Sequence, residues 1–315
     1  MIAQALVDGL LSGAIIALGA IGVTFSLAIL RFANFSHGDL LSVGAYSALF
    51  VLLMVAASAG GASAGGAAGA LAAPIGPFSF GWALPLAIGF GMLVAIGVSL
   101  ALDRWVYRRL RRRSADPLTL VFASFGLALV LRNLLLLLFG PDPYNYSSEI
   151  QMALRLPGPV LVMPDQILVF AVTLVVLAAL WLFLQRTRNG IAMRAVAENP
   201  TLSSIAGIDI ARTIRLTWIV SAALAALAGV FYGVTVQVRP EMGINLLLPL
   251  FTAAILGGVG SVAGAVLGAL LISLCENLFT LVIPGTYKPM IAFGLLLLVL
   301  YFRPQGLFAP KGGRP

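Results

Sequence analysis

The strongest constraint in this sequence is a series of long, almost uncharged apolar runs. A helix that crosses a bilayer needs about 20 such residues, and in lipid only helices or closed barrels satisfy the backbone hydrogen bonds. Barrel strands would alternate apolar and polar residues over about 10 positions, and these runs do not alternate. The sequence therefore predicts an all-α, polytopic transmembrane helical bundle. Its runs lie at about 8–30, 40–57, 82–102, 118–139, 166–184, 216–237 and 288–302, with a broken apolar region at about 246–283.

The composition agrees with a single membrane domain over residues 1–315. Hydrophobic residues make up 61% of the chain and charged residues 10%, against about 25% charged in soluble domains. One cysteine, Cys275, excludes an internal disulfide or a cysteine metal cluster, and the single histidine, His37, disfavours a histidine metal site. No catalytic set stands out. We therefore expect a protein that is not an enzyme, with no metal or cofactor of its own and no nucleic-acid partner.

The positions of the basic residues predict the orientation in the membrane. Segments 104–113 and 185–215 and the C-terminal tail hold 14 of the 19 Lys and Arg, the tail with Arg303, Lys311 and Arg314. Cytoplasmic loops carry this excess, so the loops at 58–81, 140–165 and 238–250 are expected outside. The N-terminus then lies outside if the first run crosses once, and 246–283 crosses twice or forms a re-entrant hairpin. We expect about eight or nine membrane segments. No Lys or Arg precedes Arg31, so the first run is not read as a signal peptide and is expected to be retained.

A polar break separates the first two apolar runs. It contains Asn34, Ser36, His37 and Asp39 with almost no loop residues around them. Polar groups at membrane depth are costly and mark substrate pathways, which makes these four residues candidates for a translocation path. The alternative is a short cytoplasmic turn in which Asn34 and Ser36 cap helices and Asp39 favours a first turn.

A second break lies in the apolar region near the C-terminus. Gly257, Gly258 and Gly260 precede Ser261, and glycines there can interrupt a helix that lines the pathway or allow two helices to pack closely. Glu276 sits in the next run, where a carboxylate should face protein or water. Arg132 either extends outward along its helix or faces the interior.

The segment at about 185–215 contains a short amphipathic helix. Asn199 can cap it, Pro200 suits its first position and Gly207 suits a left-handed exit. Leu202, Ile205 and Ala206 give it one apolar face. Such a helix on a cytoplasmic loop either docks on a partner protein or lies at the lipid interface.

Taken together, these segments resemble the membrane subunits of branched-chain amino-acid ABC importers, the Liv-type permease family, nearly end to end. The order and spacing look like the H-type rather than the M-type subunit. Ser36 and Asp39 stand where the family has Ala and Glu, and Arg109 where it often has Pro. The residues that carry the resemblance are Asn34–Asp39, Asp103–Arg108, Arg194–Asn199 with Gly207-Ile208, Ala253–Ser261 with Gly264, and Glu276.

The resemblance implies a permease subunit in the bacterial inner membrane. It implies a second, M-like permease, two cytoplasmic ATPases that use ATP and magnesium, and a periplasmic substrate-binding protein. Arg194, Glu198, Asn199, Pro200 and Gly207 would then couple the ATPases to transport. The chain itself has no P-loop, because Lys288 and Lys311 follow Tyr287 and Pro310. The alternatives are the same complex importing amides, urea or aromatic acids, and a self-sufficient secondary transporter or channel.

Overall fold

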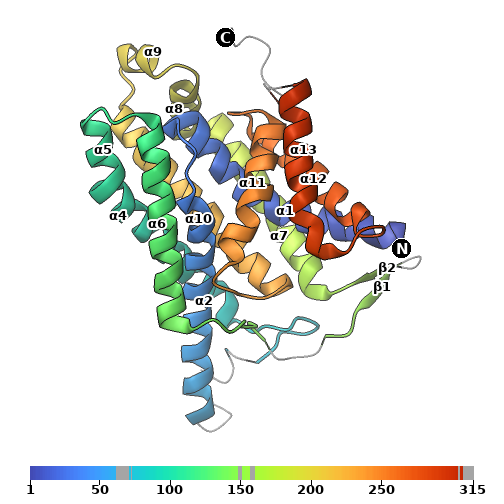
Figure 1. The fold of residues 1–315 in the computed structure, drawn as a ribbon. Coiled ribbons are helices and arrows are strands. Elements are labelled where there is room, and N and C mark those ends of the chain that lie inside the picture. The colour runs from blue at the N-terminus through green and yellow to red at the C-terminus, as the bar shows by residue number, and fades with distance from the viewer. Residues whose placement is uncertain (62–70, 72, 148–150, 157–159, 304–305, 308–315) are drawn as a thin grey trace.

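The protein is an all-helical bundle with one small β-hairpin (Figure 1). The computed structural model describes residues 1–61, 71, 73–147, 151–156, 160–303 and 306–307. Most of the expected 58–77 loop, and Lys311 and Arg314 of the expected tail, lie outside these residues. The elements are α1 Ile2–Phe25, η1 Ser26–Leu30, α2 Ser36–Gly61, α4 Ala83–Leu102, η2 Asp103–Tyr107, α5 Arg108–Arg112, α6 Pro117–Phe139, β1 Leu154–Leu156, β2 Val160–Val162, α7 Pro164–Arg186, α8 Arg188–Glu198, α9 Pro200–Ile205, α10 Ile210–Thr235, α11 Met242–Gly257, α12 Val262–Phe279, η3 Gly285–Tyr287 and α13 Lys288–Phe302.

Eight helices in the described residues are long and apolar enough to cross a membrane, and α11 is a shorter apolar helix of 16 residues. This confirms the predicted polytopic bundle of about eight or nine segments. The third span is longer than predicted: it continues through the basic stretch to Arg112 instead of ending near residue 102. Arginine is a good helix former, and Arg111 pairs with Asp103, eight residues earlier in the chain.

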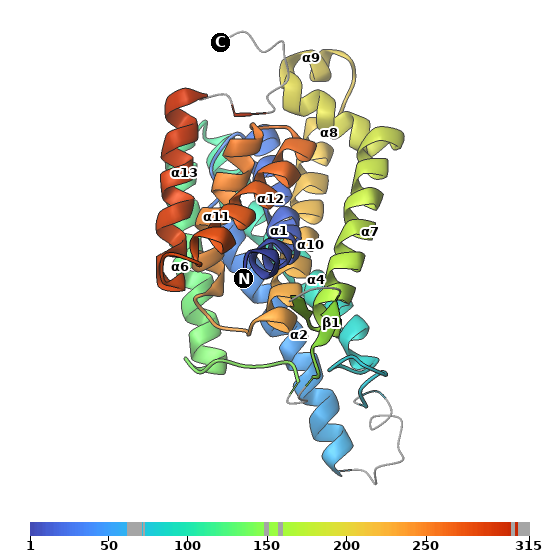
Figure 2. The same ribbon diagram turned by 90° about the vertical axis from the view of Figure 1, so that its right-hand side faces the viewer.

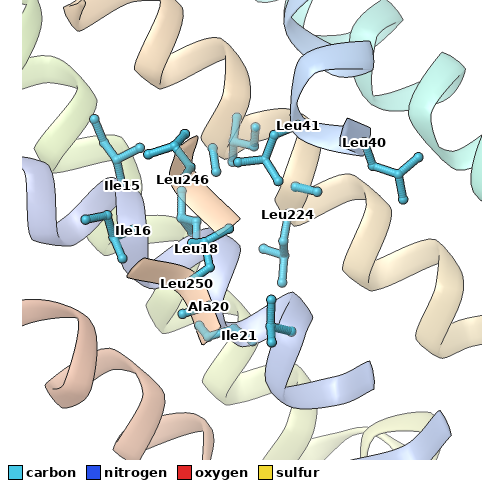
Figure 3. Packing of buried hydrophobic residues seen from close by; sticks show 14 of the residues in the cluster. Ile15, Ile16, Leu18, Ala20, Ile21, Leu40, Leu41, Leu224, Leu246 and Leu250 are labelled. Atoms are coloured by element: carbon cyan, nitrogen blue, oxygen red, sulfur yellow. The ribbon is translucent and has the colours of Figure 1, made fainter. Parts of the chain in front are cut away.

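α1 and α10 form the centre of the bundle, and α6, α7 and α13 lie at its perimeter (Figures 1 and 2). In the most apolar stretch of each helix, 89% of residues are buried in α1 and 67% in α10, against 11% in α13. α1 packs against α12, α10 and α11, and α2 packs against α4, α10 and α6. The core between these helices is aliphatic and includes Leu18, Ile21, Leu41 and Leu250 (Figure 3).

The two ends of the bundle differ in charge. α5, α8, α9 and the end of α13 lie together at one end (Figure 1), which carries most of the arginines. By the positive-inside rule this is the cytoplasmic end. The antiparallel β1–β2 hairpin lies toward the other, outer end. Gln4 exchanges two 2.9 Å hydrogen bonds with the backbone of Leu161 in β2, so the N-terminal end of α1 lies beside the hairpin, as expected for a single crossing.

The region 246–283 forms a helical hairpin of α11 and α12. Its turn, Gly258–Ser261, lies at the cytoplasmic end, because Leu307, just after α13, donates a 2.8 Å hydrogen bond from its backbone N–H to the oxygen of Leu256. α12 then returns toward the outer end, and α13 crosses back. The region thus forms a helical hairpin, and because α11 is shorter than the helices that are long enough to cross a membrane, two crossings and a re-entrant hairpin both fit it.

Candidate functional site

The polar break after α1 is buried inside the bundle. α1 continues as the π-helix η1 and ends at Arg31, whose backbone is left-handed with φ 61°. Residues 31–35 are then non-helical, and α2 begins at Ser36. Asn34, Ser36, His37 and Asp39 are each no more than 1% exposed. This burial places the break inside the bundle, and its two expected roles, translocation path or cytoplasmic turn, stay predictions.

Asn34 and Ser36 form a cluster with Tyr107 of η2. Ser36 donates to Asn34 Oδ1 at 2.7 Å, Tyr107 donates to the same oxygen at 3.2 Å, and the two hydroxyls lie 3.0 Å apart. Tyr107 also stacks on Trp218 of α10, with ring centroids 5.1 Å apart. Asn34 Nδ2 has no hydrogen-bond partner among the described residues. The sequence contained Tyr107 only as part of a motif and did not predict its contact with the break, because a single sequence does not show that η2 lies beside it.

His37 holds α2 against α1. Its Nε2 lies 3.1 Å from the backbone oxygen of Gly19. A Cβ added at Gly22 would overlap the imidazole ring. The missing side chain at Gly22 therefore creates the space that His37 fills, so His37 serves in this structure as a contact between helices.

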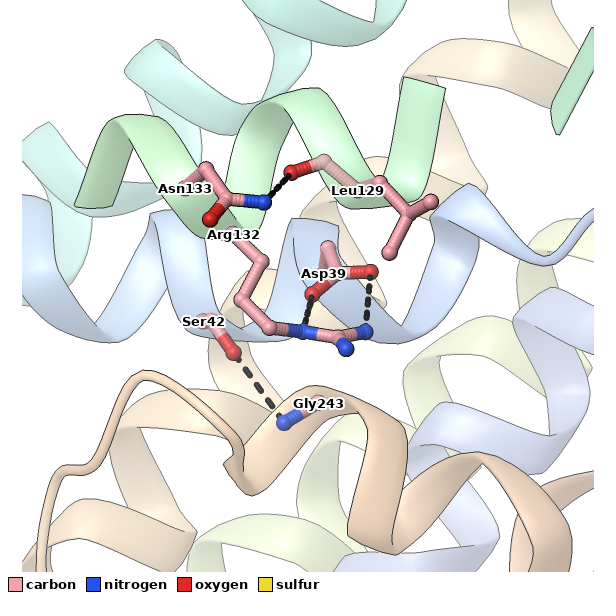
Figure 4. A network of polar contacts seen from close by, with 6 residues as sticks. All are labelled: Asp39, Ser42, Leu129, Arg132, Asn133 and Gly243. Carbon is pink, nitrogen blue, oxygen red and sulfur yellow. Dashed lines mark hydrogen bonds and ion pairs between the residues drawn. The ribbon is translucent and has the colours of Figure 1, made fainter. Parts of the chain in front are cut away.

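Asp39 forms a buried ion pair with Arg132 of α6. Arg132 donates from Nε and from one terminal nitrogen to the two carboxylate oxygens, each at 3.3 Å (Figure 4). The side chains are 2% exposed for Asp39 and 15% for Arg132. Arg132 thus faces the interior, which was one of its two expected positions. Because both groups are removed from water, the attraction between the two charges offsets part of the cost of burying them.

α2 and α11 cross closely just beyond the ion pair. Ser42 accepts a 3.1 Å hydrogen bond from the backbone N–H of Gly243 (Figure 4). A Cβ added at either Gly38 or Gly243 would overlap the other helix's backbone. The start of α2 is therefore packed against α1, α6 and α11 without room for another side chain.

The glycine break interrupts the helix and lets two helices pack closely, while its place along a translocation path stays a prediction. α11 ends at Gly257. The next two glycines, Gly258 and Gly260, adopt φ of 93° and 92°. Ser261 then caps α12, because its side chain accepts a hydrogen bond from the backbone N–H of Gly264. These φ values favour glycine. A Cβ at Gly257 would overlap the backbone of Gly264 in α12. The break is thus a turn between two tightly packed helices, and Gly260 lies beside η1 because a Cβ there would sit 3.7 Å from Ala28.

Glu276 lies apart from the first break. It is 7% exposed on α12 and borders a cavity of about 460 Å³ among the outer halves of several helices. Its Oε1 has no hydrogen-bond partner among the described residues. The structure thus does not bring Glu276 together with Asn34, Ser36, His37 and Asp39.

The outer loops build a second cavity, of about 370 Å³, that the sequence analysis did not predict. Asp165, at the start of α7, accepts from the backbone N–H and hydroxyl of Ser79 and from Gln151. Tyr146 donates to the backbone oxygen of Ala45 at 2.9 Å, and burial raises the pKa of its phenol well above the ordinary value. Three segments distant in sequence meet here, which explains why no local pattern indicated the cavity.

The cytoplasmic segment has the capping that the sequence predicted. Asn199 accepts from the backbone N–H of Leu202 at 3.0 Å, Pro200 opens α9, and Gly207 has φ 84°. Leu202 and Ile205 are 63% and 79% exposed, so the apolar face of α9 does not pack on the rest of the described chain. α8 was not predicted from the sequence. Within it, Arg194 donates to Gln185 at 2.7 Å and Glu198 is exposed.

The comparisons with known proteins agree along the whole chain. The family model described as branched-chain amino acid transport system / permease component matches residues 5–300. The high-affinity branched-chain amino acid transport system permease protein BraD of Pseudomonas aeruginosa is 34% identical over 99% of this chain and 96% of its own length. LivH of Escherichia coli K12, named in the same way, is 30% identical with the same coverage. A probable branched-chain amino acid transport permease protein, LivH of Methanocaldococcus jannaschii, is 27% identical over 96% of this chain and 91% of its own length. No solved structure matches the chain.

Proposed function

The chain belongs to the branched-chain amino acid transport permease family, and from this premise we propose that it carries branched-chain amino acids inward across the inner membrane as one subunit of an ATP-binding cassette importer. It is a multi-pass permease and not an enzyme. The observation that carries the proposal is the family match over residues 5–300, which covers all or nearly all of each membrane span in the described residues. The relatives' printed names supply the substrate class.

We propose that two cytoplasmic ATPase subunits supply the energy, using ATP and magnesium, and that one of them docks on α9. Large apolar side chains exposed together favour a protein partner, and Leu202 and Ile205 are both exposed on this six-residue helix. A second, M-like permease and a periplasmic substrate-binding protein complete the proposed complex. The binding protein would dock on the outer loops.

We propose that Arg194, Glu198, Asn199, Pro200 and Gly207 transmit the ATPase movement. α8 is held to the bundle through buried Met193 and Val196, and it contacts both α10 and η1. η1 leads directly into the Asn34–Asp39 break. A displacement of α9 would therefore reach the start of α2 through α8 and η1.

We propose that the translocation path runs between the two ends along the polar residues. Asn34, Ser36, His37 and Asp39, with the turn Gly257, Gly258, Gly260 and Ser261, would close it toward the cytoplasm. Glu276 would belong to its outer part, where the cavities lie. In the present conformation the cytoplasmic part is packed, which fits a closed inner gate.

A glycine variant tests the coupling assignment in the reconstituted complex. A Cβ at Gly207 meets nothing within 4 Å, but φ 84° strains any other residue, at about 1–2 kcal/mol. We expect Gly207→Leu to insert normally and to lose ATP-driven leucine uptake. The matched control is Gly97→Leu, since Gly97 in α4 also has open space but a regular helical backbone. Normal uptake by Gly207→Leu would contradict the coupling role.

A second pair of variants tests ATPase docking. Ile205→Asp should reduce co-purification of the ATPase subunits and ATP hydrolysis, because it places a charge in the proposed contact. Met152→Asp changes a residue that is 90% exposed on the outer side and should leave co-purification of the ATPase subunits unchanged. Uptake that follows an ion gradient and survives ATP depletion would instead favour a self-sufficient transporter. Uptake of amides, urea or aromatic acids in preference to leucine would change the substrate class alone.

A further inference from the structure

The cavity beside Glu276 has charged groups at one side and an aliphatic wall at the other. It lies among the outer parts of α1, α7, α10, α11, α12 and α13. Its volume of about 460 Å³ falls in the range of about 300–1,000 Å³ for small-molecule pockets. Asp8, Glu276 and Lys288 border it together with Ile15, Ile16 and Leu246.

Glu276 supplies an unpaired acceptor. The residue is 93% buried, since 7% of it is exposed, and Oε1 has no hydrogen-bond partner in the described part of the chain. A buried carboxylate without a partner costs several kcal/mol. Asp39 avoids this cost through Arg132, whereas Glu276 makes no ion pair with any described residue. Glu276 borders the cavity, so a cation held there could pair with its carboxylate.

Lys288 supplies the opposite charge at the start of α13. Its ammonium donates to Asn277 Oδ1 at 3.2 Å, which uses one of its three protons. Asn277 is itself fixed, because its Nδ2 donates to the backbone oxygen of Ser273 at 2.8 Å and to the hydroxyl of Ser12 at 3.2 Å. The remaining protons of Lys288 are available to an anion.

We propose that this cavity binds the transported amino acid as a zwitterion, a proposal that rests on the proposed function and names its substrate site. The substrate's ammonium pairs with Glu276 and its carboxylate with Lys288. Its branched aliphatic side chain packs against Ile15, Ile16 and Leu246. Asp8 also borders the cavity and accepts a hydrogen bond from Gln4, which leaves Glu276 and Lys288 as the two opposite charges. Together with the apolar wall they match the three parts of such a molecule.

The neighbouring outer cavity provides the entrance. Gln166, Thr235 and Val236 line both cavities. The outer cavity is bordered by the loop residues Ser79, Asn145 and Gln151, so it opens among the loops of the outer end. A substrate released there would pass these three shared residues and reach Glu276 without crossing the packed start of α2.

Uptake by the complete reconstituted complex gives the first test. Glu276→Gln keeps the size of the side chain and removes its charge. We expect it to raise the KM for leucine uptake at least tenfold, and Lys288→Met to act in the same direction. Glu241→Gln is the matched control, because Glu241 is exposed at the same end and does not line the cavity. Leucine uptake by Glu276→Gln equal to that of the unmodified complex would overturn the proposal.

Cysteine protection gives a readout that does not depend on turnover. In a Cys275→Ser background, Ser12→Cys places a thiol at the cavity wall, and Ser58→Cys places one on the exposed outer end of α2. Excess leucine should slow labelling of the first thiol by a small cationic reagent at least severalfold and leave the second unchanged. Equal labelling with and without leucine would overturn the site. Protection by phosphatidylethanolamine vesicles without amino acid would assign the cavity to a lipid headgroup and also overturn it.

The two tests separate the site from the proposed function. If the unmodified complex transports another solute class and not leucine, the proposed substrate is wrong. If it transports leucine while Glu276→Gln and Lys288→Met behave like the unmodified complex, the function stands and the site is wrong.

Discussion

Two buried polar regions of this bundle both place polar residues in apolar surroundings but differ in their partners. At the start of α2, Ser36, His37 and Asp39 each bond to a protein group, and only Asn34 Nδ2 lacks a partner among the described residues, where the helices are packed without a cavity. At the cavity, Glu276 keeps an oxygen without a partner. Burying a polar group costs free energy unless the group finds a hydrogen-bond or ion-pair partner. A group that the protein satisfies holds the fold together, and a group that it leaves unsatisfied beside a cavity is available to a ligand.

Removing Asp39 should have the largest effect on stability. Asp39→Ala leaves Arg132 buried without its counter-charge, and breaking one partner of a buried pair costs about 3–5 kcal/mol. Thermal unfolding in detergent should show a strongly lowered Tm. The double variant Asp39→Ala with Arg132→Met should recover most of the loss. A double variant as unstable as the single one would show that the pair does not account for the effect.

Filling the space at Gly22 should have the next largest effect. Gly22→Ala drives a methyl group into the His37 ring, and overpacking of a core costs about 1–3 kcal/mol. The same substitution in a His37→Ala background should cost much less, because the clash is gone. A double-mutant cycle by unfolding measures the coupling. Additive losses would contradict the assignment of His37 as the helix contact.

Removing the Tyr107 hydroxyl should have a moderate effect. Tyr107→Phe keeps the stacking on Trp218 and removes one donor to Asn34, and a single hydrogen bond contributes about 0.5–1.5 kcal/mol. Ser36 still donates to the same oxygen, which limits the loss. Unfolding of Tyr107→Phe against Tyr301→Phe, an 83% exposed tyrosine, measures it. Equal stability of the two variants would show that the Tyr107 hydroxyl contributes nothing to stability.

Neutralising Glu276 should have the smallest effect on stability. This variant gives the clearest test of the difference between the start of α2 and the cavity. Glu276→Gln removes a buried charge whose Oε1 has no partner, so Tm should stay unchanged or rise while substrate affinity falls. Asp39→Asn should lower Tm in the same assay, because its partner Arg132 loses an ionised acceptor. A comparable loss of stability in both variants would remove the distinction between the two regions.

The sequence predicted the bundle, its spans and the capping of α9 because each depends on local patterns. Long apolar runs mark the spans, and Asn199, Pro200 and Gly207 occupy the cap and exit positions that their backbone preferences favour. The helix ends were predicted less well. The third span continues to Arg112, because arginine at the membrane–water interface is also a good helix former.

The candidate site could be predicted only in part. His37, Asp39 and Glu276 can be recognised in the sequence because each is a polar residue within or beside an apolar run. Their partners do not: Asp39 and Arg132 are 93 positions apart, and Ser12 meets Asn277 across 265. The translocation path and coupling residues stay predictions for the experiments above.

The sequence by itself determined that this chain lies in a membrane and which family it belongs to, and it predicted which end faces the cytoplasm. Those properties follow from composition, charge distribution and local motifs, which need no three-dimensional context. Only the tertiary structure decided which buried polar groups are paired with one another and which border an open cavity. The physical reason is that hydrogen bonds and ion pairs depend on distances of a few ångströms between helices that sequence separation does not encode.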